Sequence, residues 1–382
     1  MRIIRKFLLG YLIISGLAAH GLAMAVIMLR PDLTLRAQMS VENWLARRWP
    51  EVFASDAQLA AQTKVDLFEV VRPWPPAPAH WQTPPGKARI SDRIFASILE
   101  ASKALTDGET LYIGAGTYTE PMILTASRIR IVGDGPVHIQ DTQAEGKAAV
   151  LMRGHDTGIS NIECSGIRVS DGNGACVRLE GRNLDLDHVY FHDSQQGILT
   201  GAEPGEVVIR NSWFVRLGQG GSSHGIYIGG GNLEIYRSIF LASRDEGHEI
   251  KTRARTTHIA SCVIASLDGV DSRLIDASNG GRLTIENSVL EEGPLSANLD
   301  AVGYGLEKDK LHNENSITIT DNTIILERVG GSRLLNLGIE PDALTISGNV
   351  IVGPDAPDPP GDNEYYSNRK EAGLRAYPIL GR

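Results

Sequence analysis

The sequence predicts an all-β protein built as a right-handed parallel β-helix (solenoid), with an N-terminal transmembrane helix and a short helical N-cap. Glycine is abundant, at 41 residues, while aromatic residues make up only 6% of the chain. From Leu111 onward, apolar residues alternate in short bursts divided by Gly, Asn, Asp and Ser. The bursts recur at a nearly constant spacing. Together these features are typical of stacked coils with tight corners.

The spacing is measured between anchors, one apolar residue from each burst. Successive anchors lie 24, 23, 26, 24, 26, 34 and 27 positions apart, and the long interval implies an insertion. Period two around the anchors predicts strands with one inward face. A second column, five positions after the anchors, is always large and apolar. A third column, three positions after the anchors, is mostly small or an amide, and we expect it to hydrogen-bond between coils at a bend. The anchors are Ile162, Leu186, Ile209, Ile235, Ile259, Ile285, Ile319 and Ile346; the second column is Ile167, Phe191, Phe214, Phe240, Ile264, Leu290, Ile324 and Ile351; the third is Ser165, Val189, Ser212, Ser238, Cys262, Ser288, Asn322 and Asn349.

Stacking explains why each column keeps one chemical character, because equivalent residues of successive parallel coils lie about 4.8 Å apart. An antiparallel sandwich does not require this, and a leucine-rich repeat has a different spacing. We therefore assign residues 91–353 to the β-helix.

The charge balance disfavours a nucleic-acid partner. Three of the 37 basic residues and none of the 46 acidic ones lie in residues 1–29, which leaves a balance of −12 for the rest. Phosphate contacts need a positive face. The three cysteines, Cys164, Cys176 and Cys262, have neither metal-ligand spacing nor an even number, so we expect packed thiols and no metal site.

The amino terminus predicts export. A basic cytoplasmic segment, residues 1–6, precedes residues 7–29, an apolar stretch long enough to cross a bilayer at about 1.5 Å per residue. The positive flank predicts a single-pass signal-anchor in the inner membrane, bound to lipid through residues 7–29, with the β-helix in the periplasm. Cleavage near Ala23-Met24-Ala25, which would give a secreted protein, is the alternative.

Three further segments flank the repeats. Residues 30–90 are interpreted as a linker because of the proline-rich run at 72–78. Residues 91–105 predict a helix, capped by Asp92, that covers the open end of the solenoid. Residues 354–382 are expected to form a C-terminal tail or cap.

Candidate functional residues concentrate between Ser223 and Glu307, where three successive coils each supply one polar segment. If Ile226, Ile250 and Leu274 point inward, alternation turns five polar side chains outward on one face. Tyr227 and Lys251 each lie eight positions before an anchor and should be neighbours. The five outward side chains are Tyr227, Glu249, Lys251, Arg253 and Arg273.

A lysine beside arginines suits proton abstraction next to a carboxylate, because neighbouring cations lower the pKa of a lysine. Arginine can neutralise the substrate carboxylate and the charge that develops on it. These are the requirements of a lyase that acts by β-elimination on an anionic, uronate-containing polysaccharide. The catalytic candidates are Lys251, Arg273, Tyr227 and His224; the substrate-binding candidates are Arg253, His248, Glu249, Arg244, Asn279 and Tyr304.

Two segments resemble known β-helix families. Residues 107–118 resemble the first coil of pectate-lyase-like β-helices. The strand around Lys251, followed 22 residues later by Arg273, resembles the lysine-then-arginine pattern of β-helix alginate lyases and chondroitinase B. The resemblance implies that Lys251 is the base and that Arg273 assists. Calcium (Ca2+) dependence is implied by the resemblance alone, and no cofactor is predicted otherwise. Residues 247–254 also resemble bacterial right-handed β-helix repeat proteins without an assigned activity.

Other interpretations of the function and of these residues stay open. The membrane anchor favours a noncatalytic polysaccharide-binding or exopolysaccharide assembly protein. A glycoside hydrolase needs two opposed carboxylates, whose separation the sequence does not give. The cations around Lys251 can also form a solvated face. His224 and His248 can instead hydrogen-bond at the corners of the coils. Turn-like sequence surrounds Asp271, Asp276, Asn279 and Asn298.

Overall fold

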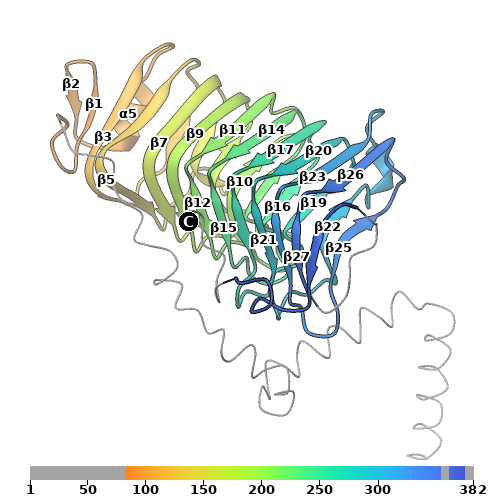
Figure 1. Ribbon diagram of the computed structural model, residues 1–382. Coiled ribbons are helices and arrows are strands. Elements are labelled where there is room, and N and C mark those ends of the chain that lie inside the picture. The colour runs from red at the N-terminus through yellow and green to blue at the C-terminus, as the bar shows by residue number, and fades with distance from the viewer. Residues whose placement is uncertain (1–81, 354–360, 375–382) are drawn as a thin grey trace, which may run out of the picture. The chain divides into compact units, whose positions relative to one another are not determined.

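The computed structural model describes residues 82–353 and 361–374, which form a parallel β-solenoid (Figure 1). This confirms the all-β class, and the winding is consistent with the predicted right-handed β-helix. The predicted anchor at residues 7–29 lies outside the described residues. Among the described residues, no helix is long and apolar enough to cross a membrane.

One sheet takes a single short strand from each coil and has nine parallel strands in the described part of the chain. Ile226, Ile250 and Ile275 are in register across its centre, so the alternating polar residues there share the outer face. The strands are β4 (Met122–Leu124), β6 (Ala148–Met152), β8 (Ala175–Leu179), β10 (Gln196–Thr200), β13 (Ile226–Ile228), β16 (Ile250–Thr252), β19 (Ile275–Ala277), β22 (Asp300–Tyr304) and β25 (Arg333–Leu337).

The second sheet has 19 strands among the described residues. Early coils contribute one long strand each: β3 (Thr110–Tyr118), β5 (Arg130–Gln140), β7 (His155–Ser165) and β9 (Arg182–His192). Later coils contribute two strands separated by a bend: β11 (Glu206–Arg210) and β12 (Trp213–Val215), β14 (Asn232–Tyr236) and β15 (Ile239–Leu241), β17 (Thr256–Ala260) and β18 (Val263–Ala265), β20 (Arg282–Glu286) and β21 (Val289–Glu292), β23 (Ser316–Thr320) and β24 (Thr323–Leu326), β26 (Ala343–Ser347) and β27 (Val350–Val352).

The predicted columns are confirmed from Leu186 to the last coil, where every anchor pairs with the next. The first anchor is wrong, because Leu186 pairs with Ile159 and not with Ile162. Inside the coils, the second column forms part of the core, with the rings of Phe214 and Phe240 stacked at 4.7 Å between centroids.

The cysteines differ from the prediction. Cys164 of β7 forms a disulfide with Cys176 of β8, which joins the two sheets within one coil. Cys164 occupies the second column in register with Phe191, so a half-cystine takes the place of a large apolar residue. The expectation of packed thiols is therefore wrong for this pair and confirmed for Cys262, which is free and buried.

Side-chain hydrogen bonds run along the bend, as the third column predicts. The backbone N–H of Ser288 donates to Asn322 Oδ1 at 2.9 Å, and that of Asn322 donates to Asn349 Oδ1 at 2.9 Å. The residue before the column turns the chain in the left-handed region, as at Asp321 with φ 57°. The side chains thereby satisfy backbone groups that the bend removes from regular pairing.

Both ends of the solenoid carry extra elements. At the start, β1 (Ala88–Ile90) pairs antiparallel with β2 (Arg93–Phe95) and β3, beside α5 (Ile98–Ala104). The predicted helix over 91–105 is therefore too long, and Ser97, not Asp92, caps it by accepting a hydrogen bond from Glu100 N at 3.1 Å. At the other end, β28 (Glu364–Tyr366) pairs with β27, within the residues expected to form a tail or cap.

Candidate functional site

A polar ladder crosses the outer face of the nine-stranded sheet. Tyr227 of β13 lies beside Lys251 of β16, as predicted, and Lys251 lies beside Asp276 of β19. Lys251 Nζ is 2.8 Å from Asp276 Oδ2 and 2.8 Å from Glu307 Oε1. Carboxylates, and not the expected arginines, therefore lie within hydrogen-bond distance of the lysine nitrogen. The neighbouring cations that the prediction of Lys251 as the base required are absent from these contacts.

Arg253 connects the rest of the ladder. Its Nε donates to Tyr227 Oη at 2.7 Å, its Nη1 donates to Asn279 Oδ1 at 2.7 Å, and its Nη2 pairs with Glu307 Oε2. Glu307 thus bridges Lys251 and Arg253 with its two carboxylate oxygens. Four predicted site residues, Tyr227, Lys251, Arg253 and Asn279, are brought together.

The predicted insertion supplies Glu307. This segment connects β22 to β23 and contains the 3-10 helix η1 (Lys308–Lys310). The backbone N–H of Glu307 donates to Ser278 O at 2.9 Å, and that of His312 donates to Asn279 O at 3.1 Å. The insertion therefore lies against the ladder, although the sequence could not specify which of its side chains reaches Lys251.

Both carboxylates of the ladder are held ionised. Burial alone would raise the pKa of Asp276, but the hydrogen bonds from His248 and Lys251 and the charge of Lys251 outweigh burial and lower it. Partial burial would also raise the pKa of Glu307, but Lys251 and Arg253 lower it. A glycoside hydrolase needs one protonated carboxyl group as its acid, so this pair does not fit that reading.

Two stacked histidines lie behind the ladder, with ring centroids 4.9 Å apart. Nδ1 of His224 accepts a hydrogen bond from His248 N at 3.1 Å, and Nδ1 of His248 accepts one from Arg273 N at 3.2 Å. Burial lowers the pKa of both rings, so each is neutral near pH 7 with its proton on Nε2. His248 Nε2 lies 3.3 Å from Asp276 Oδ2. Neither ring has a free lone pair, so neither is a general base.

Three predicted site residues are placed elsewhere. The guanidinium of Arg273 bonds to Asp300 Oδ2 at 2.5 Å, while its backbone N–H donates to His248. Arg244 pairs with Asp193 at 3.6 Å. Tyr304, predicted to bind substrate, is instead fully buried, and its hydroxyl donates to a backbone carbonyl. Tyr304 packs in the core because its position in β22 is in register with Ala277, which points inward.

Glu249, expected to face outward, is also buried. Its two oxygens accept hydrogen bonds from the N–H and the hydroxyl of Ser243. It interacts electrostatically with Asp271 and Glu291, and Glu292 completes the group. Burial raises the pKa of all four carboxyl groups, to about 7 for Asp271 and for Glu291. No sequence pattern indicates this group, because acidic side chains are usually solvated.

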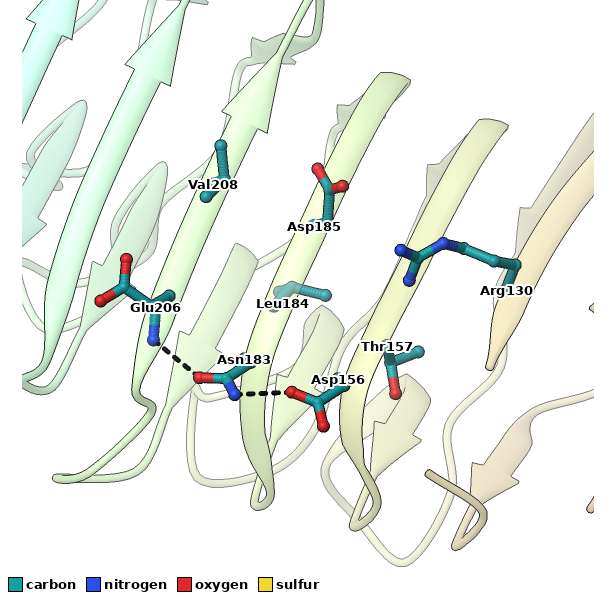
Figure 2. Close-up of a pocket in the computed structure, with 8 residues that line it drawn as sticks. All are labelled: Arg130, Asp156, Thr157, Asn183, Leu184, Asp185, Glu206 and Val208. Carbon is teal, nitrogen blue, oxygen red and sulfur yellow. Dashed lines mark hydrogen bonds between the residues drawn. The ribbon is translucent and has the colours of Figure 1, made fainter. Parts of the chain in front are cut away.

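A separate hollow lies on the larger sheet, across β5, β7, β9 and β11 (Figure 2). None of the predicted site residues lines it. Asn183 bridges its floor, donating to Asp156 Oδ1 at 2.6 Å and accepting from Glu206 N at 2.9 Å. The hollow lies on the larger sheet and the ladder on the nine-stranded sheet, so the two are separate.

Comparison with known proteins gives solved structures of similar fold. No family model matches the chain, and no curated protein matches it. An alginate lyase from Paenibacillus sp. str. FPU-7 aligns with a TM-score of 0.40 and 14% identity over 70% of this chain and 94% of that one. A PL6 alginate lyase in complex with a trisaccharide aligns with a TM-score of 0.39 and 14% identity over 67% of this chain and 56% of that one. PfbA, a surface adhesin of Streptococcus pneumoniae, aligns with a TM-score of 0.35 and 13% identity over 71% of this chain and 86% of that one. At such identities the activities of those proteins do not carry over to this chain.

Proposed function

We propose that the chain is a polysaccharide lyase that cleaves a uronate-containing polymer by β-elimination at the ladder. The observation that supports this is the position of Glu307. Its carboxylate is held by Lys251 and Arg253 together, and its side chain is 44% exposed. A uronate carboxylate needs the same two cations, so an incoming sugar can take the place of Glu307.

The reaction then follows from the side chains around that position. Lys251 and Arg253 neutralise the uronate carboxylate and the negative charge that develops on it. Tyr227, next to Lys251 and 2.7 Å from Arg253, takes the proton from carbon 5 as its deprotonated form. The electron pair forms the double bond between carbons 4 and 5, and the bond from carbon 4 to the leaving oxygen breaks. That oxygen receives the proton that Tyr227 took from carbon 5.

Activity on a panel of uronate polymers tests this proposal. The full chain is incubated with each polymer, and unsaturated ends are followed by their ultraviolet absorbance. We expect activity that Tyr227→Phe and Arg253→Gln each reduce by at least about 100-fold, in the range of a lost proton-transfer group. Arg255→Gln is the matched control, because Arg255 bonds to Asn232 outside the ladder. No activity on any polymer, or equal activity of all variants, contradicts the lyase.

A noncatalytic polysaccharide-binding protein is the second candidate. It is supported by the pairing of Lys251, Arg253 and Arg273, each of which already contacts a carboxylate. Saturable binding of a polymer whose chain length does not change over time distinguishes this function from the lyase.

We also propose that residues 7–29 hold the chain in the inner membrane with the β-helix in the periplasm. The apolar run and its basic flank support this. Fractionation of cells tests it: retention in the membrane after an alkaline wash is expected, and recovery of a shortened soluble protein would instead indicate cleavage.

A further inference from the structure

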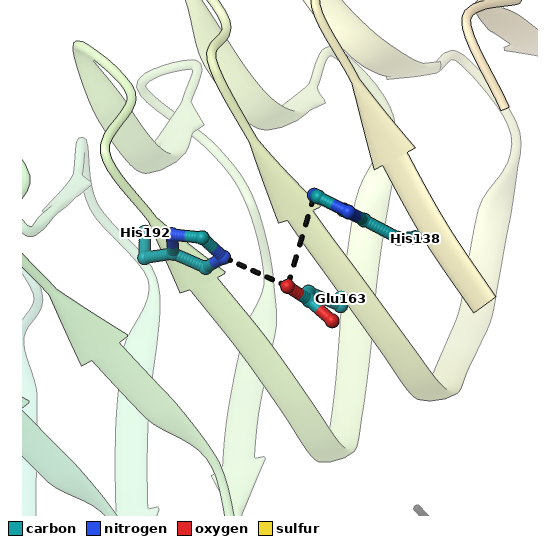
Figure 3. Close-up of side chains that lie close together, drawn as sticks. All are labelled: His138, Glu163 and His192. Atoms are coloured by element: carbon teal, nitrogen blue, oxygen red, sulfur yellow. Dashed lines mark hydrogen bonds and ion pairs between the residues drawn. The ribbon is translucent and has the colours of Figure 1, made fainter. Parts of the chain in front are cut away.

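A cluster of two histidines and a glutamate lies on the larger sheet, outside the ladder. His138, Glu163 and His192 come from β5, β7 and β9, on three successive coils (Figure 3). One potential ligand atom of each lies within 4.8 Å of the others. All three side chains are partly exposed, so a small ion can reach them.

The separations suit a transition-metal ion. Glu163 Oε1 lies 3.0 Å from His192 Nε2 and 3.8 Å from His138 Nε2. Ligands at about 2.0–2.1 Å from a tetrahedral ion lie about 3.3 Å apart, between these two values. His138 Nε2 also contacts Ser165 Oγ at 2.7 Å, and this contact has to give way when the ring turns towards the ion.

The surroundings of His192 favour a cation between the ligands. Its Nδ1 lies 2.8 Å from Asp193 Oδ2, and Arg216 holds that carboxylate through two nitrogens at 2.9 and 2.6 Å. Because Nδ1 of His192 contacts Asp193, Nε2 is the nitrogen that faces Glu163 and is placed to bind an ion. A carboxylate that orients the outer nitrogen of a ligating histidine is the usual support of such a site.

We propose that His138, Glu163 and His192 bind one divalent transition-metal ion of the zinc class, with Asp193 as the residue that positions His192. Two imidazoles and one carboxylate are the ligand set of open zinc sites, which keep a further position for water or another ligand. Imidazole ligands disfavour calcium and magnesium. Because the ligands come from three coils, the bound ion links these coils, and it stabilises the folded chain.

The larger sheet supplies a matched control. His258 Nε2 lies 2.8 Å from Glu286 Oε1, but Tyr236 occupies the neighbouring position, with its hydroxyl 3.3 Å from His258 Nδ1. This set has one histidine and one carboxylate, and it lacks the second imidazole. His258→Gln therefore removes a histidine–glutamate pair of the same sheet without touching the proposed site.

The test uses the full chain, purified without a polyhistidine tag, stripped with a chelator and titrated with cobalt(II) chloride. We expect one ion per chain with visible absorption bands of a four- or five-coordinate site, and loss of these bands when zinc chloride is added. His138→Gln and His192→Gln each abolish saturable binding, Asp193→Asn weakens it about 10- to 100-fold, and His258→Gln leaves it unchanged.

Thermal unfolding gives a second readout. Zinc raises the unfolding temperature of the parent chain and of His258→Gln, but not that of His192→Gln. Circular dichroism checks that each variant keeps its β-structure. Absence of stoichiometric binding in the parent chain overturns the proposal. Binding that survives both histidine substitutions also overturns it.

Discussion

Asp276 stands beside Lys251 on the next coil and accepts a hydrogen bond from its ammonium group at 2.8 Å, although only 3% of Asp276 is exposed. The same carboxylate oxygen lies 3.3 Å from His248 and accepts a hydrogen bond from Ser278. One buried anion therefore fixes both the cationic part of the ladder and the histidines behind it.

Removing this anion should destabilise the fold. We expect Asp276→Asn to lower the free energy of unfolding by about 2–4 kcal/mol, because it leaves a largely buried ammonium with one exposed partner. Urea unfolding measures the change. In the control, Asp185→Asn breaks the exposed pair with Arg210 and should cost less than about 1 kcal/mol. Equal effects of the two substitutions would contradict a buried role for Asp276.

The disulfide should stabilise the early coils. Cys164 and Cys176 are 12 positions apart, and closing a loop of this size contributes about 3 kcal/mol. We expect the double variant with alanine at both positions to lose about this much in urea unfolding. Cys262→Ala, which removes a buried thiol only, serves as the control for lost packing. Thiol titration of the unreduced, unfolded chain should find one reactive cysteine, and three would show that the bond does not form.

Stability should depend on pH through the buried acids. Burial raises the pKa of Asp271 to about 7, whereas an unfolded aspartate titrates near 3.9. The folded chain therefore holds this proton to higher pH than the unfolded chain. The stability that the protonated group contributes is fully present below about pH 4 and is lost as pH rises to about 7, by about 1.4 kcal/mol per pH unit.

Asp271→Asn tests that dependence. Between pH 4 and 7 the variant should become steadily more stable relative to the parent chain, as measured by urea unfolding at each pH. Asp92→Asn, at an exposed position, should run parallel to the parent. A constant difference between Asp271→Asn and the parent would mean that Asp271 titrates normally in the folded chain.

The repeat was predictable because inward residues recur in every coil, and each column must keep one chemical character to pack. The prediction of the first anchor was wrong because Cys164 occupies the position that the next three coils fill with phenylalanine, so no large apolar residue marks the column there. The predicted position of Arg273 beside Lys251 was wrong for a related reason. Lys251 follows Tyr227 by 24 positions, but its true neighbour, Asp276, follows it by 25, and one position changes the face of a strand.

Other features of the site depend on contacts that no local pattern records. Glu249 has the parity of an outward residue, but it precedes β16 and turns inward to bond with Ser243. Glu307 reaches Lys251 from 56 positions away, through an insertion that breaks the period. The metal cluster joins His138 to Glu163 and His192 across coils in which the sequence shows no ligand motif.

The central claim is that Glu307 occupies the place of a substrate carboxylate between Lys251 and Arg253. Calorimetric titration of the full chain with uronate oligosaccharides tests it most directly, whether or not the bound sugar is cleaved. We predict that Glu307→Gln binds about tenfold more tightly than the parent chain, that Arg253→Gln loses binding, and that the methyl-esterified oligosaccharide binds to none of them. Weaker binding by Glu307→Gln, or equal binding of the acid and its neutral ester, would contradict the account.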